Sequence, residues 1–392
     1  MTAKTPIIIK NARIVTETNC YDRAWLRVEN GKISAISPGD SPELPEANII
    51  DATGATLLPG FIDIHAHGGD GFDVMDGDVN SLAGMARFFA RGGVTSFLAT
   101  TWTDSGARIH QALKAIATAQ DMRSGGARLL GAHLEGPYLN AEKCGAQHSA
   151  YIRRADLTEA LPWLDLNVIR LLSLAPEFSE NHWLIKEAVS RGVTVSVAHS
   201  NGSFDQIKSA RDLGLSHATH AFNAMSPLHH REPGVVGAVL SLDDINCELI
   251  CDLEHVHPAA IDILWRCKGP DRLILITDSV KIAGMPDGRY QFSHQEVEKK
   301  DGSVRICADG TLAGTTLTMN AALRNLMSAT NLPVEALWRT ASLNAARAIN
   351  VDDRKGSIAL GKDADLVLLD DNLNVLITIV EGRTAYSRDA AD

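Results

Sequence analysis

Between residues 61 and 278, short apolar runs alternate with segments whose apolar residues recur at helical spacing. This alternation predicts strands joined by crossover helices around a parallel sheet. Asn80–Arg91 and Phe204–Leu213 are two such helical segments, and glycines follow both, as is common where helices end. The predicted strands are Phe61–His67, Val94–Thr101, Arg128–Glu135, Val168–Ala175, Val193–His199, His217–Phe222, Asn246–Asp252 and Arg272–Asp278. Eight strands with helices between them indicate an α/β fold, the (β/α)8 TIM barrel.

The two ends of the chain show a different pattern, in which short β-prone runs are separated by turn residues. Before the barrel these runs are Ile7–Ile9, Arg13–Val15, Trp25–Val28, Ile33–Ile36 and Asn48–Ile50. After the barrel they are Ile358–Leu360, Asp365–Leu369 and Leu376–Val380. We expect the tail to return to the N-terminal strands and to complete one small β unit with them.

The composition is that of a globular protein, with 392 residues of which 22% are charged. A formal net charge of −11 argues against binding to nucleic acids or to an anionic membrane surface, since both require basic patches. The six cysteines lack the spacing of a disulfide framework, and no apolar run approaches the length of a transmembrane helix. We therefore expect a cytoplasmic protein whose partner is a small molecule, and an anionic ligand would need positive groups placed locally.

Residues that bind metal ions stand at the C-terminal ends of the predicted barrel strands. His65 and His67 are separated by one residue, so in an extended strand both imidazoles point to the same side. Such a pair alone is more often part of a core or a surface than of a metal site. Similar places on other strands are held by Glu135, His199, His220 and Asp278. Because barrel enzymes carry their chemistry at this end of the strands, these residues together predict a divalent metal site.

The residue types indicate how many ions the site could hold. Glu135, His199 and His220 form a set of oxygen and nitrogen ligands that suits Zn²⁺ and leaves one position open for water or substrate. His65 and His67 can supply a second ion, for which Glu135 is the natural bridge. We therefore expect one or two divalent ions per subunit, most simply zinc.

The motifs of this chain resemble those of the amidohydrolase superfamily. The matching segments are Phe61–Gly68, His133–Pro137, Ala198–Asn201, Ala218–His220, Thr277–Asp278, Gly310–Gly314 and Gly361–Val367. More narrowly, His133–Pro137, Phe222–Met225 and Arg231–Gly234 resemble the family of N-acetylglucosamine-6-phosphate deacetylases. The similarity runs from about Leu57 to Leu369. It implies a homodimeric enzyme in which residues 58–356 form a metal-dependent barrel, and residues 1–57 plus 357–392 form a small β-sandwich domain built from both chain ends.

This resemblance implies hydrolysis of N-acetylglucosamine 6-phosphate to glucosamine 6-phosphate and acetate in amino-sugar catabolism. N-acetylgalactosamine 6-phosphate is the nearest alternative substrate. Cyclic-amide hydrolysis and purine deamination, which are other amidohydrolase reactions, fit less well, because Arg231 and the Asn223-Ala224 pair suit a phosphosugar. A barrel that serves only as a scaffold would not need metal-binding residues at its strand ends, and a measurement of metal content would identify one.

Catalytic roles follow for a few residues. Asp278 can accept a proton from the attacking water and later deliver one to the departing amine, although it could instead be a metal ligand alone. The resemblance implies that His255 hydrogen-bonds the substrate and helps to polarise its carbonyl oxygen. It assigns Arg231 to the phosphate, across a dimer interface, and the alternative is a surface arginine. The other residues that it assigns to the substrate are Ala146, Gln147, Asn223, Ala224, Leu312, Ala313 and Gly314.

Two positions depart from the family pattern. Gln147 stands where the family typically has the histidine of Gly-Ala-His, and it keeps a donor and an acceptor but carries no charge. Leu253-Glu254 replaces the usual Gly-Leu before His255, which places a carboxylate near the pocket mouth. Both changes leave the identity of the sugar open while the metal chemistry stays intact.

Overall fold

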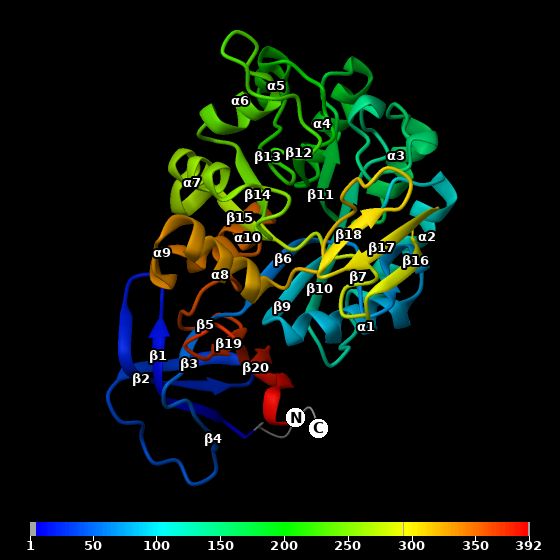
Figure 1. Ribbon diagram of the computed structural model, residues 1–392. Helices are drawn as coiled ribbons and strands as arrows, with labels where there is room; N and C mark the ends of the chain where they lie inside the picture. The colour runs from blue at the N-terminus through cyan, green and yellow to red at the C-terminus, as the bar shows by residue number, and fades with distance from the viewer. Residues whose placement is uncertain (1–4, 293, 391–392) are drawn as a thin grey trace.

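The barrel is the largest unit of the computed structural model, which describes residues 5–292 and 294–390 (Figure 1). Its strands are β6 (Phe61–Ala66), β9 (Val94–Thr100), β10 (Arg128–Glu135), β11 (Ile169–Leu174), β12 (Thr194–Val197), β13 (His217–Ala218), β14 (Asn246–Ile250) and β15 (Leu273–Ile276). They pair in sequence order and every pair is parallel. Ala66 bridges Ser279, so the end of the sheet returns to its beginning. The predicted (β/α)8 barrel is confirmed.

Several barrel strands end earlier than the sequence pattern predicts. β12 and β13 stop two residues before His199 and His220, and β15 stops two residues before Asp278. The backbone angle φ is 44° at His199, 32° at His220 and 50° at Asp278. A left-handed backbone cannot continue a strand, and it is costly for residues other than glycine. These three residues are therefore loop positions, where the chain turns at the mouth of the barrel.

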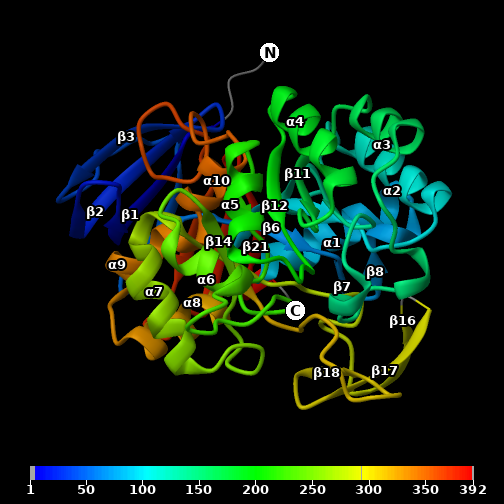
Figure 2. The ribbon, with the colours of Figure 1, turned by 90° about the horizontal axis from the view of Figure 1, so that it is seen from above.

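Helices surround the barrel strands, as the view from above shows (Figure 2). They are α1 (Val79–Arg91), α2 (Gly106–Ala119), α3 (Leu157–Leu164), α4 (His182–Ser190), α5 (Phe204–Asp212), α6 (Gly234–Ser241), α7 (Pro258–Arg272), α8 (Met319–Thr330), α9 (Val334–Leu337) and α10 (Leu343–Ala348). Short 3-10 turns span Val74–Asp76, Ala141–Lys143, Ser149–Tyr151, Ser179–Asn181, Trp338–Ala341 and Arg388–Ala390. Among the described residues, we find no helix with both the length and the apolar character that a membrane crossing requires.

The first helix illustrates how the sequence determines these elements. The side chain of Asp78 accepts hydrogen bonds from two backbone N–H groups of the first turn of α1, which caps that end. Leu82, Met85 and Phe89 recur at helical spacing and are buried. The burial of each such side chain stabilises the fold by about 1.5–3 kcal/mol.

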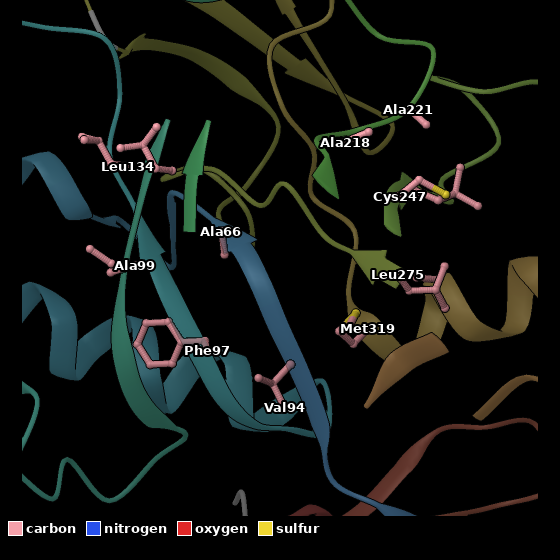
Figure 3. Close-up of a cluster of buried hydrophobic side chains, with 14 of the residues drawn as sticks. Ala66, Val94, Phe97, Ala99, Leu134, Ala218, Ala221, Cys247, Leu275 and Met319 are labelled. Atoms are coloured by element: carbon pink, nitrogen blue, oxygen red, sulfur yellow. The ribbon is translucent and has the colours of Figure 1, made fainter. Parts of the chain in front are cut away.

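Two apolar cores hold the barrel together. The larger one lies between strands and surrounding helices, and Figure 3 shows part of it, including Val94, Phe97 and Leu134. A smaller one joins buried side chains of the barrel strands, such as Leu98, to Ala345 and other residues of α10.

A second large sheet combines strands from both ends of the chain, as the prediction of a small split domain requires. Its strands are β1 (Ile7–Val15), β2 (Cys20–Glu29), β3 (Lys32–Pro38), β4 (Asn48–Asp51), β5 (Thr56–Pro59), β19 (Leu366–Leu369), β20 (Val375–Val380) and β21 (Arg383–Ser387). The order is β21-β20-β19-β5-β1-β2-β3, and β4 branches off at β1. The inward side chains of this sheet form a core of their own. Residues 1–4 and 391–392 of the predicted small domain lie outside the described residues.

The predicted strand Ile358–Leu360 is absent from this sheet. Ile358 is buried against the small core, but Leu360 is 67% exposed and Gly361 turns the chain with a φ of 83°. In a strand Ile358 and Leu360 would point to the same face, but one is buried and the other exposed, so the segment packs as an irregular turn.

A small antiparallel sheet that the sequence pattern did not predict lies between β15 and α8. It consists of β16 (Gly288–Phe292), β17 (Gln295–Lys300) and β18 (Ser303–Ile306), drawn in yellow in Figures 1 and 2. Gln295 Nε2 donates to the carbonyl of Ala146 at 3.3 Å, so this sheet contacts the loop after β10. A two-stranded ribbon, β7 (Gly68–Gly69) with β8 (Phe72–Asp73), follows the first barrel strand.

Candidate metal centre

A cavity of about 360 Å³ opens where the barrel strands end, and we call it the barrel-mouth cavity. Its lining consists of His67, Trp102, Glu135, Gly145, Ala146, Gln147, His199, His220, Asn223, Ala224, Ile250, His255, Asp278, Arg305, Gly310, Thr311, Leu312 and Gly314. The structure therefore brings most of the predicted site residues to one place. Three predicted residues are missing from the lining, namely His65, Arg231 and Ala313.

The first group of metal-binding atoms comes from β10 and from the loops after β12 and β13. Glu135 Oε1 lies 3.3 Å from His199 Nε2 and 3.1 Å from His220 Nε2, and the two imidazole nitrogens are 3.2 Å apart. His199 Nδ1 lies 2.8 Å from the carbonyl of Lys143, which leaves Nε2 directed at the group. Three donor atoms so close together can share one ion.

The second group lies on the other side of the same carboxylate. Glu135 Oε2 is 3.3 Å from His67 Nε2 and 3.6 Å from His65 Nε2. Asp278 Oδ1 lies 3.3 Å and 3.6 Å from the same two nitrogens. His65 is fully buried behind the cavity wall, which explains why it does not line the cavity. The two oxygens of Glu135 thus face different groups, as a bridging carboxylate would.

The carboxylate charges, together with one buried oxygen that has no hydrogen-bond partner among the described residues, indicate that these atoms suit a cation. Asp278 Oδ1 is buried without a hydrogen-bond partner among the described residues. Burial lowers the pKa of His65, but the carboxylates of Glu135, Asp278 and Glu248 outweigh burial and raise that pKa well above its ordinary value. Burial raises the pKa of Glu135, yet His65, His199 and His220 hold it well below its ordinary value. The negative groups that stabilise protons on the histidines would equally stabilise a divalent ion, and the mixed nitrogen and oxygen donors fit one.

A buried carboxylate that the sequence analysis missed supports both groups. Glu248 Oε2 lies 2.9 Å from His65 Nδ1 and accepts from the backbone N–H of His220 at 3.2 Å. Its other oxygen lies 3.2 Å from His217 Nε2. A proton on His65 Nδ1, held by Glu248, leaves Nε2 as the metal-binding nitrogen. The signal in the sequence was an acidic residue inside the apolar strand Asn246–Ile250.

Neighbouring side chains fix the histidine rings. The indole of Trp102 stacks on His67 with ring centroids 3.8 Å apart. His133 packs edge-on against His65 and its Nε2 lies 2.7 Å from Ser173 Oγ. Burial, with the charge of His65, lowers the pKa of His133 to about 3, so this ring is neutral. The contacts are those of a supporting residue, although His133 also lies close enough to His65 and Glu248 to form a third group of possible ligands.

His255 lines the cavity from the loop after β14. Asp252 Oδ2 lies 2.6 Å from His255 Nδ1 and accepts a hydrogen bond from the N–H at this nitrogen. Burial lowers the pKa of His255, but the hydrogen bond and the charge of Asp252 outweigh it and raise the pKa above its ordinary value. An imidazolium at this place can donate from Nε2 toward a ligand.

Gln147 is held by two neighbours inside the cavity wall. Its Nε2 donates to Glu135 Oε2 at 2.8 Å, and its Oε1 accepts from the backbone N–H of Thr103 at 2.8 Å. Only 3% of the residue is exposed. The departure from the family pattern therefore lies beside the carboxylate of Glu135 as well as in the predicted substrate loop.

The structure separates Arg231 from the cavity of its own chain. Arg231 is exposed, and its Nη1 lies 2.8 Å from His230 Nε2. Ala313 is fully buried behind the lining. Arg305 of β18, which the sequence analysis did not select, is the one lysine or arginine in the lining of the cavity as far as the described residues show.

The comparisons with known proteins agree with this geometry. The model of the amidohydrolase family matches residues 56–385. The chain is 39% identical to N-acetylglucosamine-6-phosphate deacetylase of Bacillus subtilis (strain 168) over 392 residues, which covers 98% of each chain. It is also 39% identical to N-acetylgalactosamine-6-phosphate deacetylase of Escherichia coli O157:H7 over 381 residues, covering 96% of this chain and 99% of that one. The crystal structure of N-acetylglucosamine-6-phosphate deacetylase from Pasteurella multocida superimposes with a TM-score of 0.92 at 34% identity, covering 97% of this chain and 99% of the other.

Proposed function

The chain belongs to the amidohydrolase family, and from this premise we propose that it is a metal-dependent deacetylase of N-acetylated hexosamine 6-phosphates, with N-acetylglucosamine 6-phosphate as the leading substrate. The products would be glucosamine 6-phosphate and acetate. The observation that carries the proposal is Glu135, whose two oxygens face two groups of metal-binding atoms beside Asp278 and His255. Such an arrangement suits hydrolysis of an amide.

Five residues would hold the metal, and we propose zinc as its identity. Glu135, His199 and His220 would bind one ion, and His65 and His67 a second one that shares Glu135. Bound there, a divalent ion acidifies water and polarises the acetamide carbonyl. Other residues of the chain would then position the substrate and transfer protons.

Asp278 is the proposed proton carrier. It stands at the cavity wall, with Oδ1 against the second group of histidines and 8% of the residue exposed. Its carboxylate would take a proton from the attacking water and return it to the amine nitrogen, which leaves poorly until it is protonated. Because the same carboxylate faces His65 and His67, binding of an ion and transfer of a proton are coupled at this residue.

His255 is the proposed partner of the carbonyl oxygen. Asp252 holds the proton on Nδ1, so that a protonated ring also donates from Nε2. Negative charge develops on the carbonyl oxygen as the amide is attacked, and a fixed donor stabilises this charge more than it stabilises the substrate. Asn223 and Ala224 line the cavity near the first metal group and would contact the sugar.

N-acetylgalactosamine 6-phosphate stays the second candidate substrate. The identity to the Escherichia coli relative equals the identity to the Bacillus subtilis relative, so overall similarity does not separate the two sugars. The difference between the two sugars is the orientation of one hydroxyl.

The deciding experiment is acetate release from a panel of N-acetylated hexosamines with and without a 6-phosphate, with metal content measured on the same preparation. We expect the gluco 6-phosphate to give the largest kcat/KM and the protein to contain one or two ions per subunit. Asp278→Asn, prepared in parallel, controls for contaminating deacetylase. A fully metallated protein that releases no acetate from any 6-phosphate would overturn the proposal.

The oligomer and the location complete the proposal. We propose a homodimer, in which Arg231 of one subunit reaches the cavity of the other, and a cytoplasmic location. Measurement of the molar mass in solution, together with cell fractionation, tests both.

A further inference from the structure

Glu177 lies in the loop after β11, and its carboxylate connects this loop to the loops that follow the strands on either side. Its Oε1 accepts from Asn140 Nδ2 at 2.9 Å and from the backbone N–H of Asn201 at 2.8 Å. Its Oε2 accepts from Ser200 Oγ at 2.6 Å. Asn140 belongs to the loop after β10, whereas Ser200 and Asn201 belong to the loop after β12, which also carries His199. Both oxygens of the carboxylate are therefore engaged by neighbouring loops at the mouth of the barrel.

His199 needs such support because its backbone is strained. Its φ of 44° lies in the left-handed region, where a residue with a side chain stays only if the surrounding structure holds it there. The ring must also keep Nε2 beside Glu135 Oε1, from which it lies 3.3 Å. The geometry of the first metal group therefore depends on contacts that fix both the backbone and the ring of His199.

One route of hydrogen bonds leads from Glu177 to the backbone of His199 through the next two residues of the chain. Ser200 and Asn201 both donate to the carboxylate, and a charged acceptor makes such bonds stronger than those between neutral groups. The hydroxyl of Ser200 also accepts from the backbone N–H of Gly202 at 3.1 Å. Ser200 itself is buried. This route fixes the chain on the C-terminal side of His199.

A second route leads from Glu177 through Asn140 to the imidazole. Glu177 holds the side-chain amide of Asn140, which caps the 3-10 turn Ala141–Lys143 with its Oδ1. The carbonyl of Lys143 in this turn lies 2.8 Å from His199 Nδ1. The backbone N–H of Asn140 also donates to the carbonyl of His199 at 3.0 Å. The two routes therefore start at one carboxylate and reach both the backbone and the ring of His199.

We propose that Glu177 is a positioning residue for the first metal ion, because its carboxylate fixes His199 in the orientation that binds this ion. The inference rests on the proposed function, in which His199 is a metal ligand. Removal of a residue that orients a metal ligand typically lowers metal affinity by about 10- to 100-fold. Among the described contacts, Glu177 makes no hydrogen bond to His65 or His67. Its effect should therefore fall on the first ion and spare the second.

The first test measures the affinity of each ion by stepwise removal with a chelator. We expect Glu177→Ala to weaken one ion about 10- to 100-fold while the other keeps its wild-type affinity. Glu177→Gln should recover most of the loss, because the amide oxygen can accept from Asn140 and Asn201 while the amide nitrogen donates to Ser200. Glu180→Ala is the matched control, since this carboxylate lies three residues away, is exposed and is absent from the lining of the barrel-mouth cavity.

Two further variants identify the ion and guard against a failure to fold. The double variant His65→Ala with His67→Ala should keep only the first ion, so Glu177→Ala added to it should weaken the ion that remains by the same factor. Ser200→Ala removes one of the three donors to the carboxylate and should weaken the first ion about two- to tenfold. This milder variant replaces Glu177→Ala in the series if the latter does not fold.

A second readout is acetate release as zinc is added. If Glu177 acts through His199, the activity that Glu177→Ala loses should return as zinc is raised above its weakened affinity. Wild type should show no such rise once its ions are bound. A variant that was damaged in its fold would not recover with zinc.

The outcomes separate this inference from the proposed function. Wild-type affinity for both ions in Glu177→Ala and in Ser200→Ala would refute the inference. An equal loss of both ions would do so as well, because Glu177 would then support the whole mouth of the barrel. A wild-type protein that holds its ions but releases no acetate would instead refute the proposed function, and the metal titrations would still decide the role of Glu177.

Discussion

Gln147 Nε2 donates a hydrogen bond to Glu135 Oε2 at 2.8 Å, the oxygen that faces His65 and His67. The backbone of Thr103 fixes the other end of the same amide. A neutral amide in this position orients the carboxylate of Glu135, the proposed bridge between two ions, without competing for it by charge. The residue that distinguishes this chain within its family pattern is therefore hydrogen-bonded to a residue of the proposed metal centre.

Substitutions of Gln147 test whether its side chain acts mainly on metal binding, through Glu135, or on recognition of the sugar. Gln147→Ala should weaken binding of the ion shared by Glu135 about 10- to 100-fold, as is typical when a residue that orients a ligand is removed. Metal titration measures this. Gln147→His should in addition shift the ratio of kcat/KM between gluco and galacto 6-phosphates, because a hydrogen bond to a hydroxyl discriminates strongly. Unchanged metal affinity and an unchanged ratio would show that the position is neutral.

Alanine substitutions should divide the proposed ligands into two sets, one for each ion. Glu135→Ala, His199→Ala and His220→Ala should each lose bound metal and activity together, since every one removes a donor of the first ion. A double variant, His65→Ala with His67→Ala, should keep one ion per subunit. Elemental analysis of dialysed protein checks both. Wild-type metal content in all of the first three variants would be incompatible with the assignment, as would two ions in the double variant.

Glu248→Gln should affect one ion more than the other. The amide still contacts His65 Nδ1 but no longer holds a proton there by charge, so affinity at the His65 and His67 group should fall about 10- to 100-fold. Stepwise metal removal with a chelator measures the difference. Glu46→Gln, an exposed substitution, is the control. Equal loss of both ions would mean that Glu248 supports the fold of the barrel interior.

Asp278→Asn should lower kcat by about 10²- to 10⁴-fold, the usual contribution of a general acid or base. The substitution keeps the shape of the side chain but removes the group that carries the proton. Calorimetry with glucosamine 6-phosphate should show that the product still binds. Turnover near the wild-type rate, with metal content unchanged, would assign proton transfer to another group.

Asp252→Asn should move the alkaline limb of the pH profile to lower pH. Asp252 raises the pKa of His255, whereas burial lowers it, so without this carboxylate the ring loses its proton at a lower pH. The protonated ring is the proposed donor, and activity therefore falls as pH rises through this pKa. The pH dependence of kcat/KM reports the shift. In His255→Gln this limb should vanish, and its persistence there would mean that another group produces it.

The sequence predicted the barrel and the grouping of the proposed ligands at its mouth because both obey simple rules. Strand-forming runs at regular intervals indicate a barrel, and residues at strand ends converge because parallel strands end on one side. The rules do not cover the backbone at His199, His220 and Asp278, where positive φ ends the strands early. Propensity disfavours these angles, and only the surrounding tertiary contacts stabilise them.

The residues that were missed depend on contacts between distant segments. Glu248 contacts His65, which lies 183 positions away in the sequence. An acidic residue inside the apolar strand Asn246–Ile250 indicates a buried carboxylate, but the strand does not indicate which residue that carboxylate contacts. Arg305 lies in a sheet whose central strand, Gln295–Lys300, contains one buried apolar residue, Val297. A strand with so little apolar character resembles a polar loop in the sequence, and only pairing with its neighbours makes it a strand.

The pairing of β5 with β19 joins Thr56–Pro59 to Leu366–Leu369, which the ribosome makes more than 300 residues later. At roughly 5–20 residues per second, about 15–60 s of translation separate the two strands. During that interval the edge of β5 that β19 later covers has its N–H and C=O groups unpaired, and such edges recruit other strands. The nascent chain should therefore be most prone to aggregation, and most dependent on chaperones at the ribosome, until Leu366–Leu369 emerges.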